Sequence, residues 1–169
     1  ALPILHAMMR QFAECDRRCR LVAIADPALE AVKQRVAALP QPQRDPHPTL
    51  YEDVDAMLAA ERSRLDGILI GTRCSLHAEM MVKTLPLGIP IFLEKPVATT
   101  PEDYRRLERM AERYDTPVVV SFPLRYTPLV QTVKTLLDSG KIGRTSHVQA
   151  VNNVTYGGTY FHGWYRDEG

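Results

Sequence analysis

Cysteine is scarce in this chain of 169 residues, which contains only Cys15, Cys19 and Cys74. An odd and sparse set of cysteines fits a reducing compartment better than a secreted fold built on disulfides, so we expect a cytoplasmic protein. Cys15 and Cys19 could share one helix face as metal ligands, but no second pair of ligands completes a site. We therefore expect packing roles for both residues, and no metal site.

Charge of one sign and long hydrophobic runs are missing as well. The formal net charge is +1, whereas a nucleic-acid surface normally needs a clustered excess of basic residues. No apolar run reaches the roughly 20 residues that cross a membrane, and no signal-like segment opens the chain. Hydrophobic residues make up 45% and charged residues 24%, as in an ordinary globular protein. These absences favour a small-molecule partner over nucleic acid or membrane.

A glycine-rich phosphate loop is a further absence. A dinucleotide-binding domain needs one before its first helix, because the pyrophosphate requires close backbone approach and a helix amino terminus. This chain instead begins at Ala1, without an initiator Met, in a stretch (2–12) with helical spacing of apolar residues. Either the loop precedes Ala1 or the protein never had one. We expect the chain to be an excerpt of a longer protein.

Two kinds of apolar segment alternate along residues 1–122. Apolar residues at helical spacing predict helices, and short continuous apolar runs predict strands, of which 67–71 is typical of a strand covered on both faces. The predicted strands are 21–25, 67–71, 89–93 and 118–120, and the predicted helices are 2–12, 29–39, a short one around 54–58, 75–85 and 100–114. Because parallel neighbours need crossover helices, this order predicts an α/β fold with a doubly wound parallel sheet.

Local signals predict several boundaries. Ser75 and Thr100 are expected to cap the helices that follow them, with Pro101 at the first helical position. Gly88 is available to end the helix that runs toward Leu85. The proline-rich stretch 40–48 cannot continue a helix and is expected to be a loop. The buried stripe of the helix after Thr100 is expected to comprise Tyr104, Leu107, Met110 and Tyr114.

The pattern changes after Phe122. Thr127-Pro128 is expected to open a helix with Leu129, Val133 and Leu136 facing inward, and Gly140 to end it. Residues 144–155 are expected to form a longer, half-polar strand. We therefore assign residues 1–122 to one domain and residues 123–169 to the first part of another.

Polar residues at the carboxyl ends of the predicted strands are the candidate site, because ligands gather there in doubly wound sheets. Asp26 could accept hydrogen bonds from the ribose of an adenine dinucleotide, or it could simply cap the next helix. Lys95, after a buried strand, is expected to be partly desolvated and suits proton transfer; an ordinary ion-paired strand end is the alternative. Glu94 could neutralise Lys95, position it or contact the nicotinamide ribose. Pro96 fixes the turn, and its peptide bond is of the kind that can be cis.

The ordered set of these segments resembles the Gfo/Idh/MocA oxidoreductases, relatives of glucose-fructose oxidoreductase and inositol dehydrogenase. The likeness spans nearly the whole chain. Its components are the strand ending in Asp26-Pro27, Thr72 with His77, Glu94-Lys95-Pro96, Arg125-Tyr126, the turn 140–143, Tyr156-Gly157-Gly158 and Trp164-Tyr165-Arg166.

The resemblance implies a Rossmann-like dinucleotide-binding domain over 1–122, without its first strand and glycine-rich loop. It implies that 123–169 is the truncated start of a C-terminal α+β domain for substrate binding and oligomerisation, and that the protein is a homodimer or homotetramer. The implied activity is that of an NAD(P)-dependent dehydrogenase acting on a hydroxyl-bearing carbon of a sugar, inositol or related polyol. A nicotinamide-binding sensor or assembly protein of the same fold, without catalysis, is the alternative.

The resemblance also implies residue roles. Lys95 would be catalytic, beside nicotinamide and substrate. The cofactor side would comprise Asp26, Thr72, His77, Glu94 and Pro96, and the substrate side would comprise Arg125, Tyr126, Trp164 and Arg166. A helix-capping or core histidine is the alternative for His77, and surface packing is the alternative for the substrate-side residues.

An aspartate at position 26 repels a ribose 2′-phosphate, which favours NAD over NADP, although Arg44 and Arg73 keep NADP open. The family's distal proton-transfer histidine would come after Gly169. Lys95 would then be one half of the catalytic pair, so we expect the segment alone not to be a competent catalyst.

Overall fold

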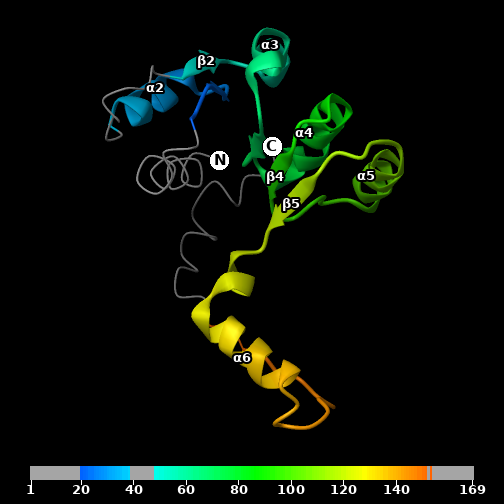
Figure 1. Ribbon diagram of the computed structural model, residues 1–169. Helices are drawn as coiled ribbons and strands as arrows, with labels where there is room; N and C mark the ends of the chain where they lie inside the picture. Colours follow the sequence, from blue (N-terminus) through cyan, green and yellow to red (C-terminus); the bar gives the residue numbers. More distant parts are fainter. Residues whose placement is uncertain (1–19, 39–47, 152, 154–169) are drawn as a thin grey trace. The chain divides into compact units, whose positions relative to one another are not determined.

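The computed structural model describes residues 20–38, 48–151 and 153 (Figure 1). The chain divides into two compact units, Ala1–Phe122 and Pro123–Gly169, and each is described by itself. The predicted helix at 2–12 and residues 40–47 of the predicted proline-rich loop lie outside the described residues.

The first unit contains two parallel sheets. One pairs β1 with β2, and the other has the order β3-β4-β5, with every pairing parallel. The strands are β1 (Ala23–Ala25), β2 (Thr49–Tyr51), β3 (Ile68–Ile70), β4 (Ile91–Glu94) and β5 (Val118–Ser121). The predicted parallel α/β architecture is thereby confirmed. Strand β2 was not predicted, because three residues directly after a proline-rich stretch are too few to show a period.

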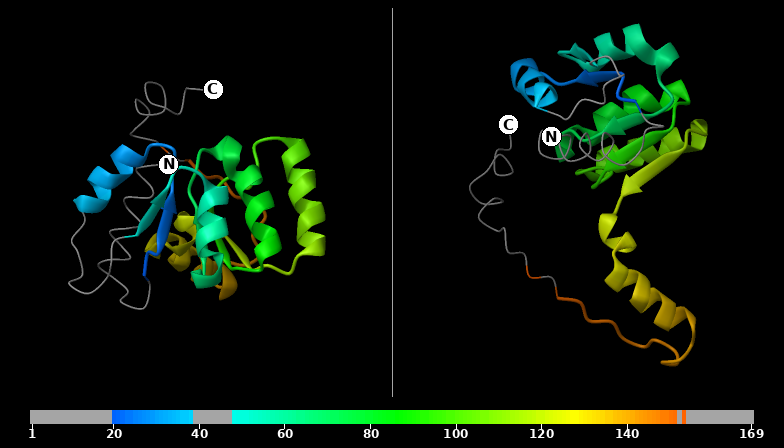
Figure 2. Two further views of the ribbon diagram at one scale, coloured as in Figure 1. Left: turned by 90° about the horizontal axis from the view of Figure 1, so that it is seen from above. Right: turned by 60° about the vertical axis from the view of Figure 1, so that its left-hand side comes forward.

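Helices connect the strands. They are α2 (Leu29–Ala37), α3 (Val54–Glu61), α4 (His77–Thr84) and α5 (Pro101–Arg113), with 3₁₀ turns η1 (Arg62–Arg64), η2 (Cys74–Leu76) and η3 (Leu85–Leu87). Helices α4 and α5 lie side by side, and α4 packs against β3 and β4 (Figure 2). The ammonium of Lys83 on α4 contacts the carboxylate of Asp55 on α3 at 2.8 Å, which links these two helices as well.

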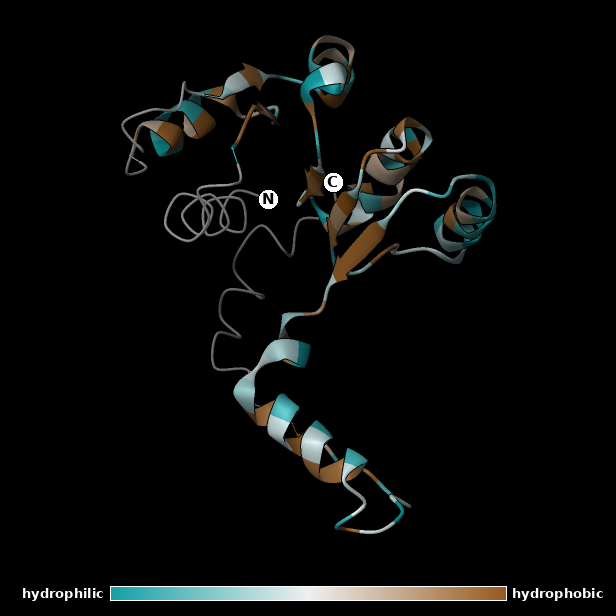
Figure 3. Cartoon of the chain, viewed as in Figure 1, coloured by the Kyte–Doolittle hydropathy of each residue, from teal (hydrophilic) through white to brown (hydrophobic). Residues whose placement is uncertain are grey.

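The main core lies between the sheet β3-β4-β5 and its helices. Side chains alternate in burial along the strands, with Ile70 and Leu93 buried and Leu69 and Phe92 half-buried. Leu93 is 0% exposed. The buried cluster comprises Leu58, Ile68, Ile70, Ala78, Met81, Leu85, Ile91, Leu93 and Leu107. Figure 3 shows β4 and β5 in apolar colours, although Val118 and Val119 of β5 are exposed.

A smaller cluster fastens the sheet of β1 and β2. Ile24 on β1 packs with Val32 and Val36 on α2, and Leu21 and Leu50 cover it. The spacing of Val32 and Val36 is one helical turn, so both side chains lie on the face that meets the strand.

The predicted helix boundaries are partly confirmed. Thr100 caps α5 by accepting a hydrogen bond from the Asp103 amide at 3.1 Å. Gly88 follows η3 in the left-handed conformation, with φ of 69°, as its predicted role as a helix end requires. The prediction that Ser75 caps a helix is wrong, because residues 74–76 form a 3₁₀ turn and α4 begins only at His77, without a side-chain cap.

The predicted buried stripe of α5 is too long by one residue. Leu107 is buried, and Met110 and Tyr114 pack against the main core. Tyr104, in contrast, is 57% exposed. It lies in the first turn of α5, and the apolar contacts of this helix begin one turn later.

The second unit contains the 3₁₀ turn η4 (Pro123–Tyr126) and helix α6 (Pro128–Asp138). Thr127 caps α6 as predicted, by accepting a hydrogen bond from the Val130 amide, and Gly140 follows the helix with φ of 68°.

Two predictions fail within the described part of this unit. Leu129, Val133 and Leu136 are exposed rather than inward-facing. Residues 144–151 and 153 form no strand. A strand is defined by hydrogen bonds to a neighbour, and none of the described segments pairs with these residues. That the unit belongs to an α+β domain remains a prediction.

Candidate active site

Strand β4 carries the Glu94-Lys95-Pro96 triplet at its carboxyl end. Glu94, the last strand residue, pairs in register with Ser121 of β5 and is half-buried. Lys95 follows it with an exposed side chain, and the Lys95–Pro96 peptide bond is cis. The lysine is therefore more accessible than the predicted, partly desolvated residue. An exposed amine at a strand end is within reach of a ligand that crosses this edge of the sheet.

Thr72 occupies the equivalent position on the neighbouring strand. Ile70 of β3 pairs with Leu93 of β4, so Thr72 and Lys95 each lie two residues beyond the same pair. Thr72 is half-buried, and its hydroxyl donates to the Arg73 carbonyl at 3.3 Å. Because parallel strands end at the same edge, the register brings these two predicted residues to one side of the sheet.

His77 joins the two turns. It is 1% exposed, at the first position of α4. Its Nδ1 lies 2.6 Å from the carbonyl oxygen of Pro96, and its Nε2 lies 3.2 Å from that of Thr72. The ring therefore belongs to the core, and its influence on a ligand passes through Thr72 and Pro96.

Asp26 follows β1 and is half-buried. Its Oδ1 accepts a hydrogen bond from the Ala28 amide at 2.8 Å, and its own amide donates to the Tyr51 carbonyl at 3.0 Å. The carboxylate therefore forms a turn before α2, but it does not cap the helix as the alternative predicted, because the N-cap residue is Ala28 and no side chain caps it. Only one carboxylate oxygen takes part in that bond, so the other remains suited to a ribose hydroxyl.

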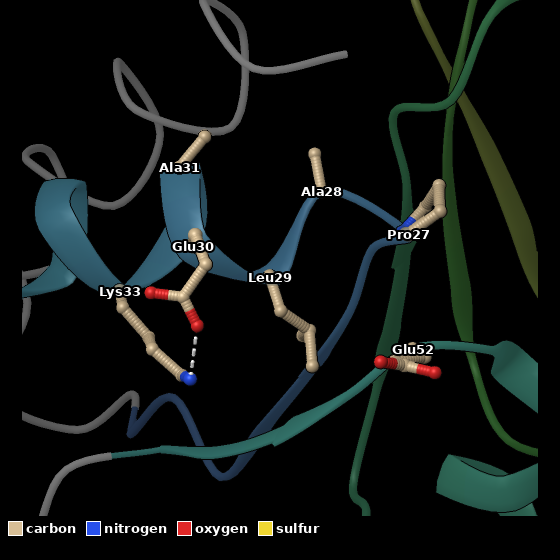
Figure 4. Close-up of a pocket in the computed structure, with 7 residues that line it drawn as sticks. All are labelled: Pro27, Ala28, Leu29, Glu30, Ala31, Lys33 and Glu52. Carbon is tan, nitrogen blue, oxygen red and sulfur yellow. Dashed lines mark hydrogen bonds and ion pairs between the residues drawn. The ribbon is translucent and has the colours of Figure 1, made fainter.

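An open hollow of about 440 Å³ lies at the start of α2, and Pro27, the residue after Asp26, is part of its lining. Figure 4 shows Glu30 and Lys33 of α2 on one side and Glu52, after β2, on the other. Lys33 and Glu30 form an ion pair at 2.5 Å, which balances their charges. Glu52 leaves the lining with one negative charge in excess. The full lining is Pro27, Ala28, Leu29, Glu30, Ala31, Lys33 and Glu52.

Sequence reasoning missed a buried acid that supports this region. Glu61, on α3, is 4% exposed. It accepts hydrogen bonds from the Tyr51 hydroxyl at 2.9 Å and from Arg64 at 2.6 Å. Burial and the hydrogen bond to Glu61 raise the pKa of Tyr51. A glutamate near a helix end normally indicates a solvated position, so only the fold reveals this contact.

Only two of the four predicted substrate-side residues lie in the described part of the chain. Arg125 and Tyr126 lie in η4 of the second unit, where Tyr126 is 80% exposed. Trp164 and Arg166 lie outside the described residues. The substrate side remains a prediction.

Over residues 20–38, 48–151 and 153, no group of three or more His, Cys, Asp or Glu side chains could hold a metal ion. Within the same ranges, no helix has the length and apolar character needed to cross a membrane.

Parallel strands with crossover helices, and polar residues at their carboxyl ends, define a nucleotide-binding α/β class. The family model GFO_IDH_MocA, described as "Oxidoreductase family, NAD-binding Rossmann fold", matches residues 4–122. The chain therefore belongs to the Gfo/Idh/MocA oxidoreductase family, which confirms the resemblance seen in the sequence.

Individual relatives and solved structures are similar to parts of this chain. The chain is 32% identical over 91 residues to inositol 2-dehydrogenase 2 of Saccharopolyspora erythraea, covering 53% of this chain and 27% of the relative. It is 25% identical over 152 residues to scyllo-inositol 2-dehydrogenase (NAD(+)) of Bacillus subtilis, covering 89% and 38%. The solved myo-inositol dehydrogenase of Lactobacillus casei, in complex with NAD(H) and myo-inositol, has a TM-score of 0.72 at 24% identity, covering 83% of this chain and 40% of that one. The chain thus spans well under half the length of each.

The first unit is an NAD-binding Rossmann domain by family. The free oxygen of the Asp26 carboxylate could accept a hydrogen bond from a ribose hydroxyl, and its charge would repel a 2′-phosphate. Thr72 and Lys95 could contact a ligand at the edge of the other sheet. The glycine-rich loop that would hold the pyrophosphate is not among residues 20–38 or 48–151.

Proposed function

We propose that the complete protein is a dehydrogenase that transfers a hydride between NAD and a hydroxyl-bearing carbon of a sugar, inositol or related polyol. NADP is the weaker alternative, given the negative charge of Asp26. The observation that supports this activity best is the exposed amine of Lys95, two residues beyond the pair of Ile70 and Leu93 at the edge that also carries Thr72. Bound NAD would supply the hydride acceptor.

Lys95 would transfer the proton in this reaction. When the substrate alcohol is oxidised, its carbon loses a hydride and its oxygen loses a proton. A lysine amine within hydrogen-bond reach of that oxygen can orient the hydroxyl and accept the proton, and it returns the proton in the reverse reaction. An exposed position at the strand end leaves the amine accessible to the substrate.

The cofactor side is built from residues of the first unit. Asp26 would accept a hydrogen bond from the adenosine ribose through the oxygen that does not bind Ala28. Thr72, Glu94 and Pro96 would line the nicotinamide end. His77 would act there through the carbonyls that it contacts.

The substrate class rests on the named relatives, which include inositol dehydrogenases. Arg125, Tyr126, Trp164 and Arg166 would face this substrate, since guanidinium and aromatic groups can hold a polyol. We further propose that the protein is cytoplasmic and works as a homodimer or homotetramer.

The test is the Lys95→Ala variant of the complete protein, assayed with NAD and a panel of inositols and sugars. Turnover should fall by about 10²-fold or more, as is typical when a general acid or base is lost, while NADH binding persists. Lys83→Ala, which removes a lysine from α4, is the control and should turn over normally. Unchanged turnover in Lys95→Ala would refute the role. NADH binding by the wild type with no turnover of any polyol would instead favour the non-catalytic sensor.

A further inference from the structure

The His77 ring lies between two turns, and each of its two nitrogens is close to a carbonyl oxygen of one turn. One turn follows β3 at Thr72, and the other follows β4 at Pro96. The residue just before Pro96 is Lys95. The buried ring therefore contacts the residue that directly follows the proposed catalytic lysine.

The ring itself is firmly held. It stands at the start of α4, whose Ala78 and Met81 belong to the main core. At 1% exposure it has almost no freedom to change rotamer without displacing its neighbours. Because the ring is fixed, it restricts the positions of the Pro96 and Thr72 carbonyls that it contacts.

Both partners of the ring are hydrogen-bond acceptors. A carbonyl oxygen cannot donate, so each bond requires an N–H on the imidazole. The neutral ring carries one N–H and satisfies one carbonyl, whereas the imidazolium carries two and satisfies both. The shorter distance, 2.6 Å, is the one to Pro96. The stronger contact is therefore made to the turn that carries Lys95.

We propose that His77 is a positioning residue that sets the arrangement of the Lys95 turn relative to the Thr72 turn. It does so from between the two turns: one ring nitrogen lies 2.6 Å from the Pro96 carbonyl oxygen and the other lies 3.2 Å from the Thr72 carbonyl oxygen, and the N–H of the ring binds the Pro96 turn. This inference rests on the proposed function, because the quantity that it affects is the proton-transfer geometry of Lys95. A small misplacement of a reacting group can cost about 10²-fold in rate.

The first experiment is a double-mutant cycle in the complete protein. It combines His77→Phe, which keeps a ring but removes its two nitrogens, with Lys95→Ala. His77→Phe should lower kcat by about 10- to 100-fold per NADH-binding site, with a smaller change in NADH affinity. In the Lys95→Ala background the same change should lower kcat by about twofold at most, because there is no amine left to position.

The controls separate positioning from stability. Thr84 is equally buried, at 1% exposure, on the same helix, and its hydroxyl donates to Met80 within α4. Thr84→Val should lower thermal stability without lowering kcat of the folded protein. His77→Gln retains an N–H donor and should recover part of the lost kcat; it also replaces His77→Phe in the cycle if the latter does not fold.

A second readout is independent of turnover. Amide hydrogen exchange at residues 72–76 and 95–99 should become faster in His77→Phe. It should not become faster in Thr84→Val. Equal losses of kcat from the His77 change with and without Lys95, or unaltered exchange in both turns, would overturn the proposal. A normal rate in Lys95→Ala alone would instead refute the proposed function, so the two failures can be told apart.

Discussion

The hydroxyl of Tyr51 donates a hydrogen bond to the buried carboxylate of Glu61, while the carbonyl of Tyr51 accepts one from the amide of Asp26. Tyr51 therefore connects α3 to the start of the proposed ribose-binding segment. The hydrogen bond from its hydroxyl holds the last residue of β2 against α3. The hydrogen bond to its carbonyl then holds Asp26, the residue that follows β1. A residue that contacts no ligand can in this way affect cofactor affinity.

Tyr51→Phe tests that connection. The variant leaves one oxygen of the Glu61 carboxylate without its Tyr51 donor, which should lower the free energy of unfolding. NADH affinity, measured by fluorescence titration, should fall as well because the Asp26 segment is less well held. Tyr104→Phe is the matched control, since that tyrosine is exposed, and it should change neither quantity. Normal stability in Tyr51→Phe would show that the hydrogen bond contributes nothing.

The ion pair between α3 and α4 predicts a stability change at alkaline pH. The hydrogen bond to Asp55 raises the pKa of Lys83 above its ordinary value of 10.5, and Glu79 adds to the effect. The folded state therefore holds this proton more tightly than the unfolded state does. The stabilisation is complete below pH 10.5 and is lost as the pH rises through the folded-state pKa.

Denaturant titrations of the wild type and of Asp55→Asn should show this directly. The wild type should be more stable by about 0.2–1 kcal/mol at neutral pH, the usual worth of a surface ion pair. The gap should narrow above pH 10.5. A constant gap across that range would exclude Lys83 as its source.

Asp26→Asn should shift cofactor preference. The amide oxygen can still accept the bond from Ala28, so the turn is preserved while the negative charge is removed. The ratio of NADP to NAD affinity should rise by about tenfold, which corresponds to about 1.4 kcal/mol. Asp66→Asn, which changes an exposed acid of the first unit, should leave the ratio unaltered. If Asp26→Asn leaves it unaltered too, the carboxylate does not discriminate between the cofactors.

Leu107 and Tyr104 should differ sharply in their contribution to stability. Leu107 is buried in the main core, and its replacement by Ala should cost about 2–5 kcal/mol. Tyr104 is 57% exposed, so Tyr104→Ala should stay within about 0.5 kcal/mol. Thermal unfolding of the two variants side by side would check this, and a large loss for Tyr104→Ala would contradict the position of that side chain.

The sequence was sufficient for those parts of the fold that have a strong local signal. Long apolar runs such as 67–71 predict strands, and Thr100-Pro101 is an unambiguous helix start. Thr49–Tyr51 was missed because three residues carry no periodicity. Ser75 was misassigned because a serine inside a 3₁₀ turn looks the same in sequence as one before a helix.

In the candidate site, too, positions with a local signal could be predicted, whereas contacts between distant segments could not. Asp26, Thr72 and Lys95 could be predicted because each directly follows a strand pattern. The contacts of His77 could not, since Pro96 is 19 residues away along the chain and meets the ring only through the packing of α4. Glu61 is similar, because its burial depends on a tyrosine from β2.

The register of the two sheets has a consequence for how this domain can be altered. Thr72 and Lys95 stand two residues beyond the pair Ile70 and Leu93, while Asp26 and Glu52 stand one residue beyond the pair Ala25 and Tyr51. Within each set, the separation of the polar groups is inherited from strand pairing that the core enforces. Connecting segments can therefore be lengthened, shortened or exchanged far from these edges without changing the spacing of the chemical groups. The same coupling means that neither spacing can be retuned one residue at a time without repacking the strands beneath it.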